Sequence, residues 1–93
     1  MKRFFLQFDN EDETIIRSVL SHLRNKGDVH EVLGTFYCFL SDSYDNTLEL
    51  RDDILDNSDN AKIFVMEIPG GINSAWHLSV ENSNWLKSVL DGK

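Results

Sequence analysis

The sequence predicts an α+β fold whose elements follow the order strand, helix, strand, strand, helix, strand. Three observations support this prediction. Alternating apolar residues mark four extended segments, two amphipathic stretches with cap signals lie between them, and turn residues separate the segments. The length of 93 residues suits one small domain, so we expect residues 1–93 to form a single domain.

The first predicted strand covers residues 2–9, and the first predicted helix runs from about residue 11 to residue 26. Alternate side chains of the strand are apolar, which gives it one core face. In the helix, apolar residues recur at helical spacing, acidic residues come first, basic residues come last, and Gly27 ends it. The apolar stripe consists of Ile15, Ile16, Val19, Leu20 and Leu23.

Residues 29–33 and 35–40 predict a hairpin with a turn at Gly34. The second arm is apolar on both faces, as expected for a central strand that is covered on both sides. One face carries Phe36, Cys38 and Leu40, and the other carries Thr35, Tyr37 and Phe39.

A capping box of Asn46 and Glu49 predicts a second helix that ends near Asn57. This helix lies in an acidic segment, because residues 41–59 hold seven Asp and Glu against Arg51 alone. We expect a solvated acidic face, and a surface that binds a protein partner is the alternative. The net charge of −7 and the scattered bases disfavour nucleic-acid binding.

The last strand of the pattern covers residues 62–68, with Ile63 and Val65 on one face and Phe64 and Met66 on the other. After Pro69, Gly70 and Gly71, residues around Trp76 and Leu78 alternate as a short fifth strand, and residues 83–90 predict a terminal helical turn.

The element order is that of a ferredoxin-like fold, an antiparallel sheet with both helices on one face. The other face is then bare in a monomer, and we expect aromatic residues there to mark an interaction site. We predict a homodimer, formed either by stacking the bare faces or by adding the fifth strand to the partner's sheet edge. The predicted interface residues are Phe5, Tyr37, Phe39, Trp76 and Leu78.

Several segments together resemble one known family: the first strand ending in Phe8-Asp9, the aromatic hairpin arm, the strand KIFVMEI, and a tail with AW and NWLKSVL. The chain resembles the small CRISPR-associated endoribonucleases of the spacer-acquisition complex, and more closely their stand-alone bacterial and phage relatives. The resemblance implies a homodimer whose fifth strand reaches the other protomer. It also implies a divalent-metal site at the dimer axis, formed by Asp9 of each protomer, and Mg²⁺-dependent cleavage of RNA or DNA.

Asp9 has two alternative roles. It could cap the first helix, with Asp12 three residues on, in competition with a capping box of Asn10 and Glu13. It could instead bind Mg²⁺, which is often held by only one or two carboxylates, water and phosphate, so two copies of Asp9 would suffice.

No other residue pattern predicts chemistry. His22, His30 and His77 are expected at boundaries or interfaces, and Cys38 as a small buried apolar residue. No signal peptide or membrane span is recognisable, so we expect a cytoplasmic protein. The first hypothesis is a Mg²⁺-dependent endonuclease that uses Asp9 as its catalytic residue. The alternative is a non-catalytic acidic protein, antitoxin-like or inhibitor-like, that binds a protein partner.

Overall fold

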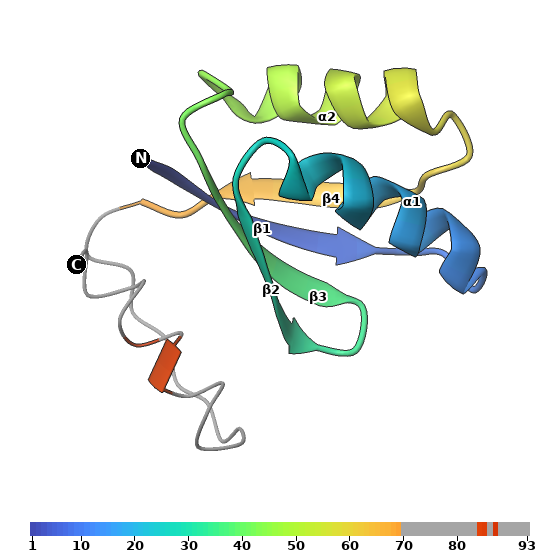
Figure 1. Cartoon of the computed structure of the whole chain (residues 1–93), viewed down its shortest axis with the longest axis horizontal. Helices are drawn as coiled ribbons and strands as arrows, with labels where there is room; N and C mark the ends of the chain where they lie inside the picture. Colours follow the sequence, from blue (N-terminus) through green and yellow to red (C-terminus); the bar gives the residue numbers. More distant parts are fainter. Residues whose placement is uncertain (70–83, 86, 88–93) are drawn as a thin grey trace.

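A computed structural model of the protein describes residues 1–69, 84, 85 and 87, and its elements follow the predicted order (Figure 1). The prediction of an α+β fold is therefore confirmed, although the first helix is shorter than predicted at both ends. The strands are β1 (Lys2–Phe8), β2 (Asp28–Leu33), β3 (Phe36–Ser41) and β4 (Ile63–Glu67), and the helices are α1 (Glu13–Arg24) and α2 (Thr47–Asn57).

The strands form one antiparallel sheet in the order β2-β3-β1-β4. The two central strands are β1 and β3, as predicted, so the aromatic segments of the chain lie in the middle of the sheet. Strand β4 pairs with β1 and lies at one edge, and no other described strand pairs with it.

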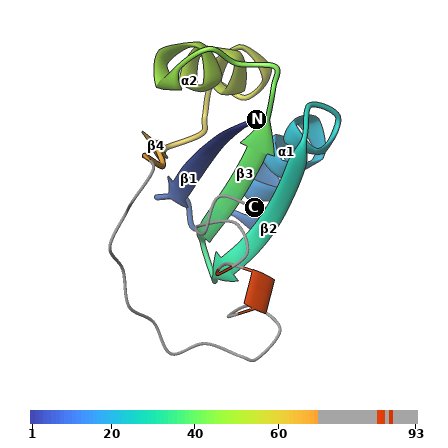
Figure 2. The same cartoon turned by 90° about the vertical axis from the view of Figure 1, so that its left-hand side faces the viewer.

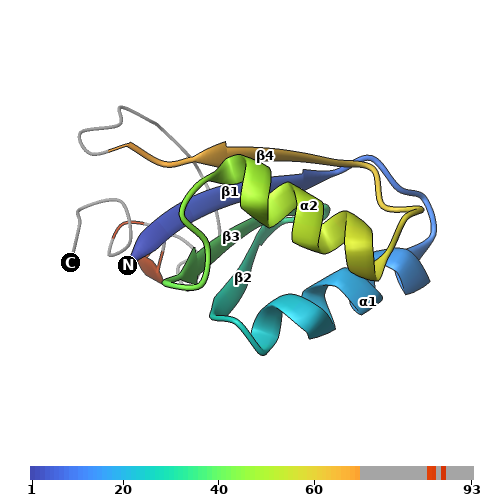
Figure 3. The same cartoon turned by 90° about the horizontal axis from the view of Figure 1, so that it is seen from above.

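Both helices pack on the same face of the sheet, as Figures 2 and 3 show from two directions. The core between helices and sheet contains completely buried side chains such as Phe4 and Phe39, and burying each contributes about 1.5–3 kcal/mol. The principal buried residues of this core are Phe4, Leu6, Phe8, Ile16, Val19, Leu20, Leu23, Tyr37, Phe39, Tyr44, Leu50 and Ile54.

The prediction that Tyr37 and Phe39 lie on the bare face of the sheet is wrong. In the register of β1 and β3, Phe39 lies opposite Phe4 and Tyr37 opposite Leu6, so both join the core under the helices. Phe5 does emerge on the opposite face. Because both faces of β3 are apolar, its pattern alone does not show which set meets the helices, and a shift of one residue exchanges the sets.

Two glycines occupy positions that suit glycine for different reasons, Gly34 for its backbone angle and Gly27 for its close packing. Gly34 has a φ of +42° in the β2–β3 turn, which confirms the predicted turn. Gly27 lies so close to β3 that a Cβ atom there would stand 2.0 Å from the Leu40 carbonyl oxygen. The chain therefore needs a residue without a side chain where it leaves α1.

The predicted fifth strand, with Trp76, His77 and Leu78, lies outside the described residues. Of the predicted terminal turn, Asn84, Trp85 and Lys87 are described, and all three are helical. Within the described part of the chain, no helix combines the length and the apolar character that a membrane crossing requires.

Candidate functional site

Asp9 follows β1 directly, and its side chain is exposed. Its backbone N–H donates a hydrogen bond of 2.8 Å to the Lys62 carbonyl oxygen. The N-cap of α1 is Asp12, whose side chain accepts a hydrogen bond of 2.8 Å from the Thr14 N–H. Both predicted caps, Asp9 and Asn10, are therefore wrong.

The cap lies further along the chain because Asn10 has a different role. Its side-chain oxygen accepts a hydrogen bond of 2.8 Å from the Lys62 N–H, and its side-chain nitrogen donates one of 3.1 Å to the Asn60 carbonyl oxygen. These long-range contacts hold Asn10 outside the helix, and Glu13 forms an ion pair with Arg17 at 3.2 Å instead of a capping box. Asp9 is left without a capping role.

The metal role of Asp9 stays a prediction. Among the described residues, no group of three or more His, Cys, Asp or Glu side chains could hold a metal ion. Asp9 offers one carboxylate per chain, which suits half of a Mg²⁺ site but does not complete one. The donor set therefore fits a metal only if a second copy of Asp9 faces it.

The bases that a nuclease would need do not gather around Asp9. Lys62 is its neighbour through the backbone hydrogen bond, but Lys2 lies at the other end of β1, about 20 Å away for a strand of this length. There Lys2 pairs with Glu67 at 3.5 Å. Arg17 forms its ion pair with Glu13 of the same helix, so Lys2 and Arg17 are both paired away from Asp9.

The sheet face opposite the helices is covered unevenly. Its β2–β3 half holds a second apolar cluster, to which Trp85 adds by stacking on His30 with ring centroids 4.1 Å apart and planes 14° apart. On β4, by contrast, the Phe64 side chain is 64% exposed and Met66 is 39% exposed. The second apolar cluster consists of Val32, Cys38 and Ile68, with Phe5, Phe36, Leu40 and Trp85 packed against them.

Cys38 lies in that cluster and is completely buried. Burial raises the pKa of its thiol to about 12. The side chain is therefore an uncharged apolar group at neutral pH, which confirms the prediction and disfavours a thiol nucleophile.

A polar network that the sequence pattern did not reveal joins the two helices. His22 Nε2 of α1 lies 2.7 Å from Asp53 Oδ2 of α2, and the buried Tyr44 hydroxyl donates to the same oxygen. Asn57 Nδ2 lies 3.2 Å from the His22 nitrogen. Burial alone would raise the pKa of Asp53, but the hydrogen bonds from Tyr44 and His22 outweigh it and hold the pKa below its ordinary value.

This network stabilises the contact between the helices. Its short hydrogen bonds and partly buried side chains suit a structural role. Its members are far apart in the sequence, so no local spacing announces them. One signal was available: Asp53 and Asn57 are four residues apart, directly beside the inward stripe of Leu50 and Ile54. Asp53 is accordingly the acidic residue of α2 that turns inward.

Most other acidic residues of the segment 41–59 are exposed, as predicted. The only base within it, Arg51, bonds the neighbouring Asp52 at 2.8 Å, and the chain's amino terminus pairs with Asp42 at 3.4 Å. The outer surface of α2 is consequently negative.

A scan against protein-family models and searches of curated proteins and of solved structures found no match.

Proposed function

We propose that the protein is a ferredoxin-like interaction protein whose first partner is a second copy of the same chain. The observation that carries this proposal is the exposure of Phe64 and Met66, which lie two residues apart on the same face of the edge strand β4. Large apolar side chains on a sheet edge favour pairing with another chain, because association buries them and satisfies the free backbone groups.

The ferredoxin-like assignment is supported by the strand order. Strand β3 lies between β1 and β2, and β1 lies between β3 and β4, so each helix connects two parallel strands that have one strand between them. That split arrangement, repeated twice, is typical of the fold. Membership of the CRISPR-associated small-nuclease superfamily is part of the same proposal and is supported by the resemblance of the sequence.

The acidic surface of α2 supports a non-catalytic role. Exposed acidic residues on a helix with one base favour a basic protein surface over the phosphates of a nucleic acid. We propose such a surface as the second partner, in addition to self-association. The exposed residues that would meet it include Glu49, Asp52 and Asp56.

The oligomeric state tests the first part. We expect light scattering at micromolar concentration to give a dimer for the wild type and a monomer for Phe64→Asp. Leu33→Asp is the matched control, because Leu33 is 58% exposed on the opposite edge strand β2. It should leave the dimer intact. A monomeric wild type, or a dimeric Phe64→Asp variant, would refute association through β4.

A metal-dependent nuclease is the second candidate, favoured by the exposed Asp9 carboxylate that does not cap α1. We expect Asp9→Asn to abolish Mg²⁺-dependent cleavage of RNA or DNA without changing the free energy of unfolding. Asp12→Asn is the control, because it changes a carboxylate of the same loop that caps the helix. Undiminished cleavage by Asp9→Asn would remove Asp9 from the mechanism, and a wild type without cleavage would reject the candidate.

A further inference from the structure

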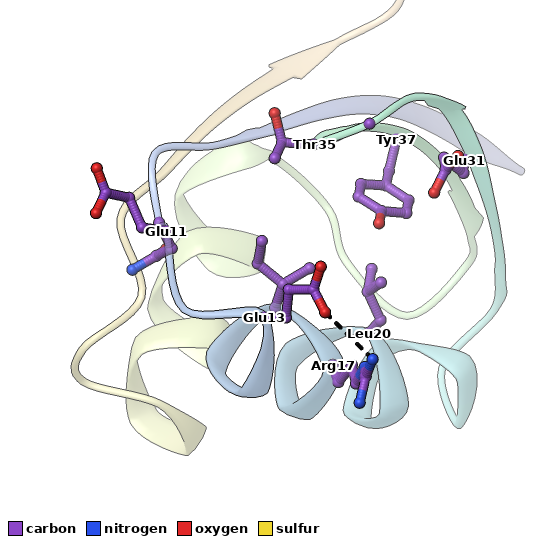
Figure 4. A pocket seen from close by; sticks show the side chains of 10 residues that line it. Glu11, Glu13, Arg17, Leu20, Glu31, Thr35 and Tyr37 are labelled. Carbon is purple, nitrogen blue, oxygen red and sulfur yellow. Dashed lines mark hydrogen bonds and ion pairs between the residues drawn. The ribbon is translucent and has the colours of Figure 1, made fainter.

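A hollow of about 460 Å³ lies between the first half of α1 and the β2–β3 turn, on the helix-covered side of the sheet (Figure 4). Its floor is apolar, formed by Ile16 and Leu20 of α1 and the ring of Tyr37 from β3. Its rim is charged, with Glu13 on α1 and Glu31 on β2. An apolar floor with few polar groups suits a ligand that has a hydrocarbon part and one charged end.

The Tyr37 side chain is the most informative part of the lining. It is 8% exposed, and its hydroxyl points into the hollow in Figure 4. Burial raises the pKa of Tyr37, and the negative charge of Glu31, to which its proton turns, raises it further. No described residue donates a hydrogen bond to the phenol oxygen. A hydroxyl that donates its proton keeps lone pairs that can accept, so this oxygen can accept a hydrogen bond from a donor outside the chain.

The charge of the rim indicates the sign of that donor. Glu11, Glu13 and Glu31 line the hollow with one base, Arg17, which bonds Glu13 at 3.2 Å. Among the described residues, no salt bridge is formed by Glu31. The balance of three carboxylates against one guanidinium leaves a net charge of −2, so a cation is favoured. An ammonium group has three donors, and the phenol oxygen and the Glu31 carboxylate, which lie on the same side of the hollow in Figure 4, provide acceptors.

We propose that this hollow binds an aliphatic primary ammonium group, which meets the Tyr37 hydroxyl and Glu31 while its alkyl chain lies on Ile16 and Leu20. Two sources carry this chemistry, a free alkyl diamine and a lysine side chain of another protein. No residue of β4 lines the hollow. Its binding and the association through β4 can therefore fail independently of each other.

An NMR titration of the ¹⁵N-labelled full chain tests the proposal with two probes, 1,5-diaminopentane and N-acetyl-lysine methylamide. We expect saturable shifts centred on the amides of Glu13, Arg17, Glu31 and Tyr37. Neutral analogues of the same length, pentanol and N-acetyl-norleucine methylamide, should not produce them. The tighter of the two cationic probes identifies the source. Shifts that do not saturate, or that spread over the acidic face of α2, would overturn the proposal.

Two variants and one control sharpen the test. Tyr37→Phe keeps the ring that packs edge-on against Phe8 at 5.7 Å and removes only the hydroxyl, and Glu31→Gln removes one exposed charge. Each should weaken the binding of the better probe about tenfold, the size of one hydrogen bond to a charged group. Asp56→Asn, a charge removed on α2, should leave it within about twofold. Unchanged binding by both Tyr37→Phe and Glu31→Gln, or an equal loss in Asp56→Asn, would contradict the proposed contacts.

Discussion

Replacing Tyr44 by Phe would isolate one link of the network between α1 and α2. The substitution keeps the ring, which packs against Phe39 with centroids 6.0 Å apart, and removes the hydroxyl that donates to Asp53. His22 keeps its own contact of 2.7 Å with the same carboxylate. The change in stability therefore reports a single hydrogen bond to a charged acceptor.

The size of that change follows from the burial of the two partners. A hydrogen bond to a charged group is worth about 1.5–3 kcal/mol, and removing it leaves the carboxylate with one protein donor fewer. The Asp53 side chain is 32% exposed, so water can partly replace the hydroxyl. We expect Tyr44→Phe to lower the free energy of unfolding by about 1–2 kcal/mol, and Tm by roughly 4–15 °C for a chain of this size.

The pH dependence gives the prediction a second test. Because the pKa of Asp53 is lowered in the folded protein, its contribution is present above the ordinary value of about 3.9 and is lost as pH falls through the folded pKa. The difference between wild type and Tyr44→Phe should therefore be full at pH 7 and at pH 5, and smaller at pH 3.

Urea denaturation with a double-mutant cycle provides the measurement. Tyr44→Phe, Asp53→Asn and the double variant should give a coupling energy of about 1 kcal/mol or more between the two side chains. A coupling energy below about 0.3 kcal/mol, or a difference that is as large at pH 3 as at pH 7, would refute the role of the hydrogen bond.

Three further predictions can be checked by the same urea denaturation. Gly27→Ala should lower the free energy of unfolding by about 1–3 kcal/mol, because the new methyl group meets the backbone of β3. Gly34→Ala has open space around the new methyl group and should lower it by about 1 kcal/mol because of the positive φ. Equal losses in the two variants would contradict this. Leu50→Ala should cost about 2–5 kcal/mol, and Leu48→Ala, at a position that is 55% exposed, under about 0.5 kcal/mol. The pKa of Cys38 is raised to about 12 in the folded protein, so the stabilisation that the neutral thiol provides is full below the ordinary thiol pKa and is lost as pH rises toward 12. The free energy of unfolding should therefore decline more steeply above about pH 9 in the wild type than in Cys38→Ala.

The order and type of the elements could be predicted because a local period or, for α2, a local cap signal marks each of them. Strand β4 is the best example: Ile63 and Val65 pack on the core under the helices while Phe64 and Met66 point to the other face, as the alternation indicates. Strand β3 shows the limit. Its two faces are equally apolar, and only pairing with β1, distant in the sequence, decides which one meets the helices.

The candidate sites were predictable in the same uneven way. The cap of α2 is local, and Asn46 accepts the predicted hydrogen bond from the Glu49 N–H at 2.9 Å. The cap of α1 could not be predicted from the local sequence, because Asn10 forms hydrogen bonds with a loop some fifty residues away instead. The Tyr44 and Asp53 contact was also out of reach, since it depends on how the helices meet.

The side chain of Asn10 joins the loop before α1 to the loop before β4 through two hydrogen bonds. Its amide holds Lys62 and Asn60, while Asp9 bonds back to Lys62, so these amides continue the β1–β4 ladder beyond the strands. Because these hydrogen bonds are exposed, the amide hydrogens should exchange more slowly than those of an unbonded loop but faster than those of the sheet interior. Spontaneous deamidation at Asn10 would replace the nitrogen that donates to the Asn60 carbonyl oxygen by a carboxylate oxygen, which cannot donate, while the Lys62 N–H could still donate to the new carboxylate. Chemical ageing of one residue would then remove one of the two side-chain bonds that join the loops at this end of the molecule.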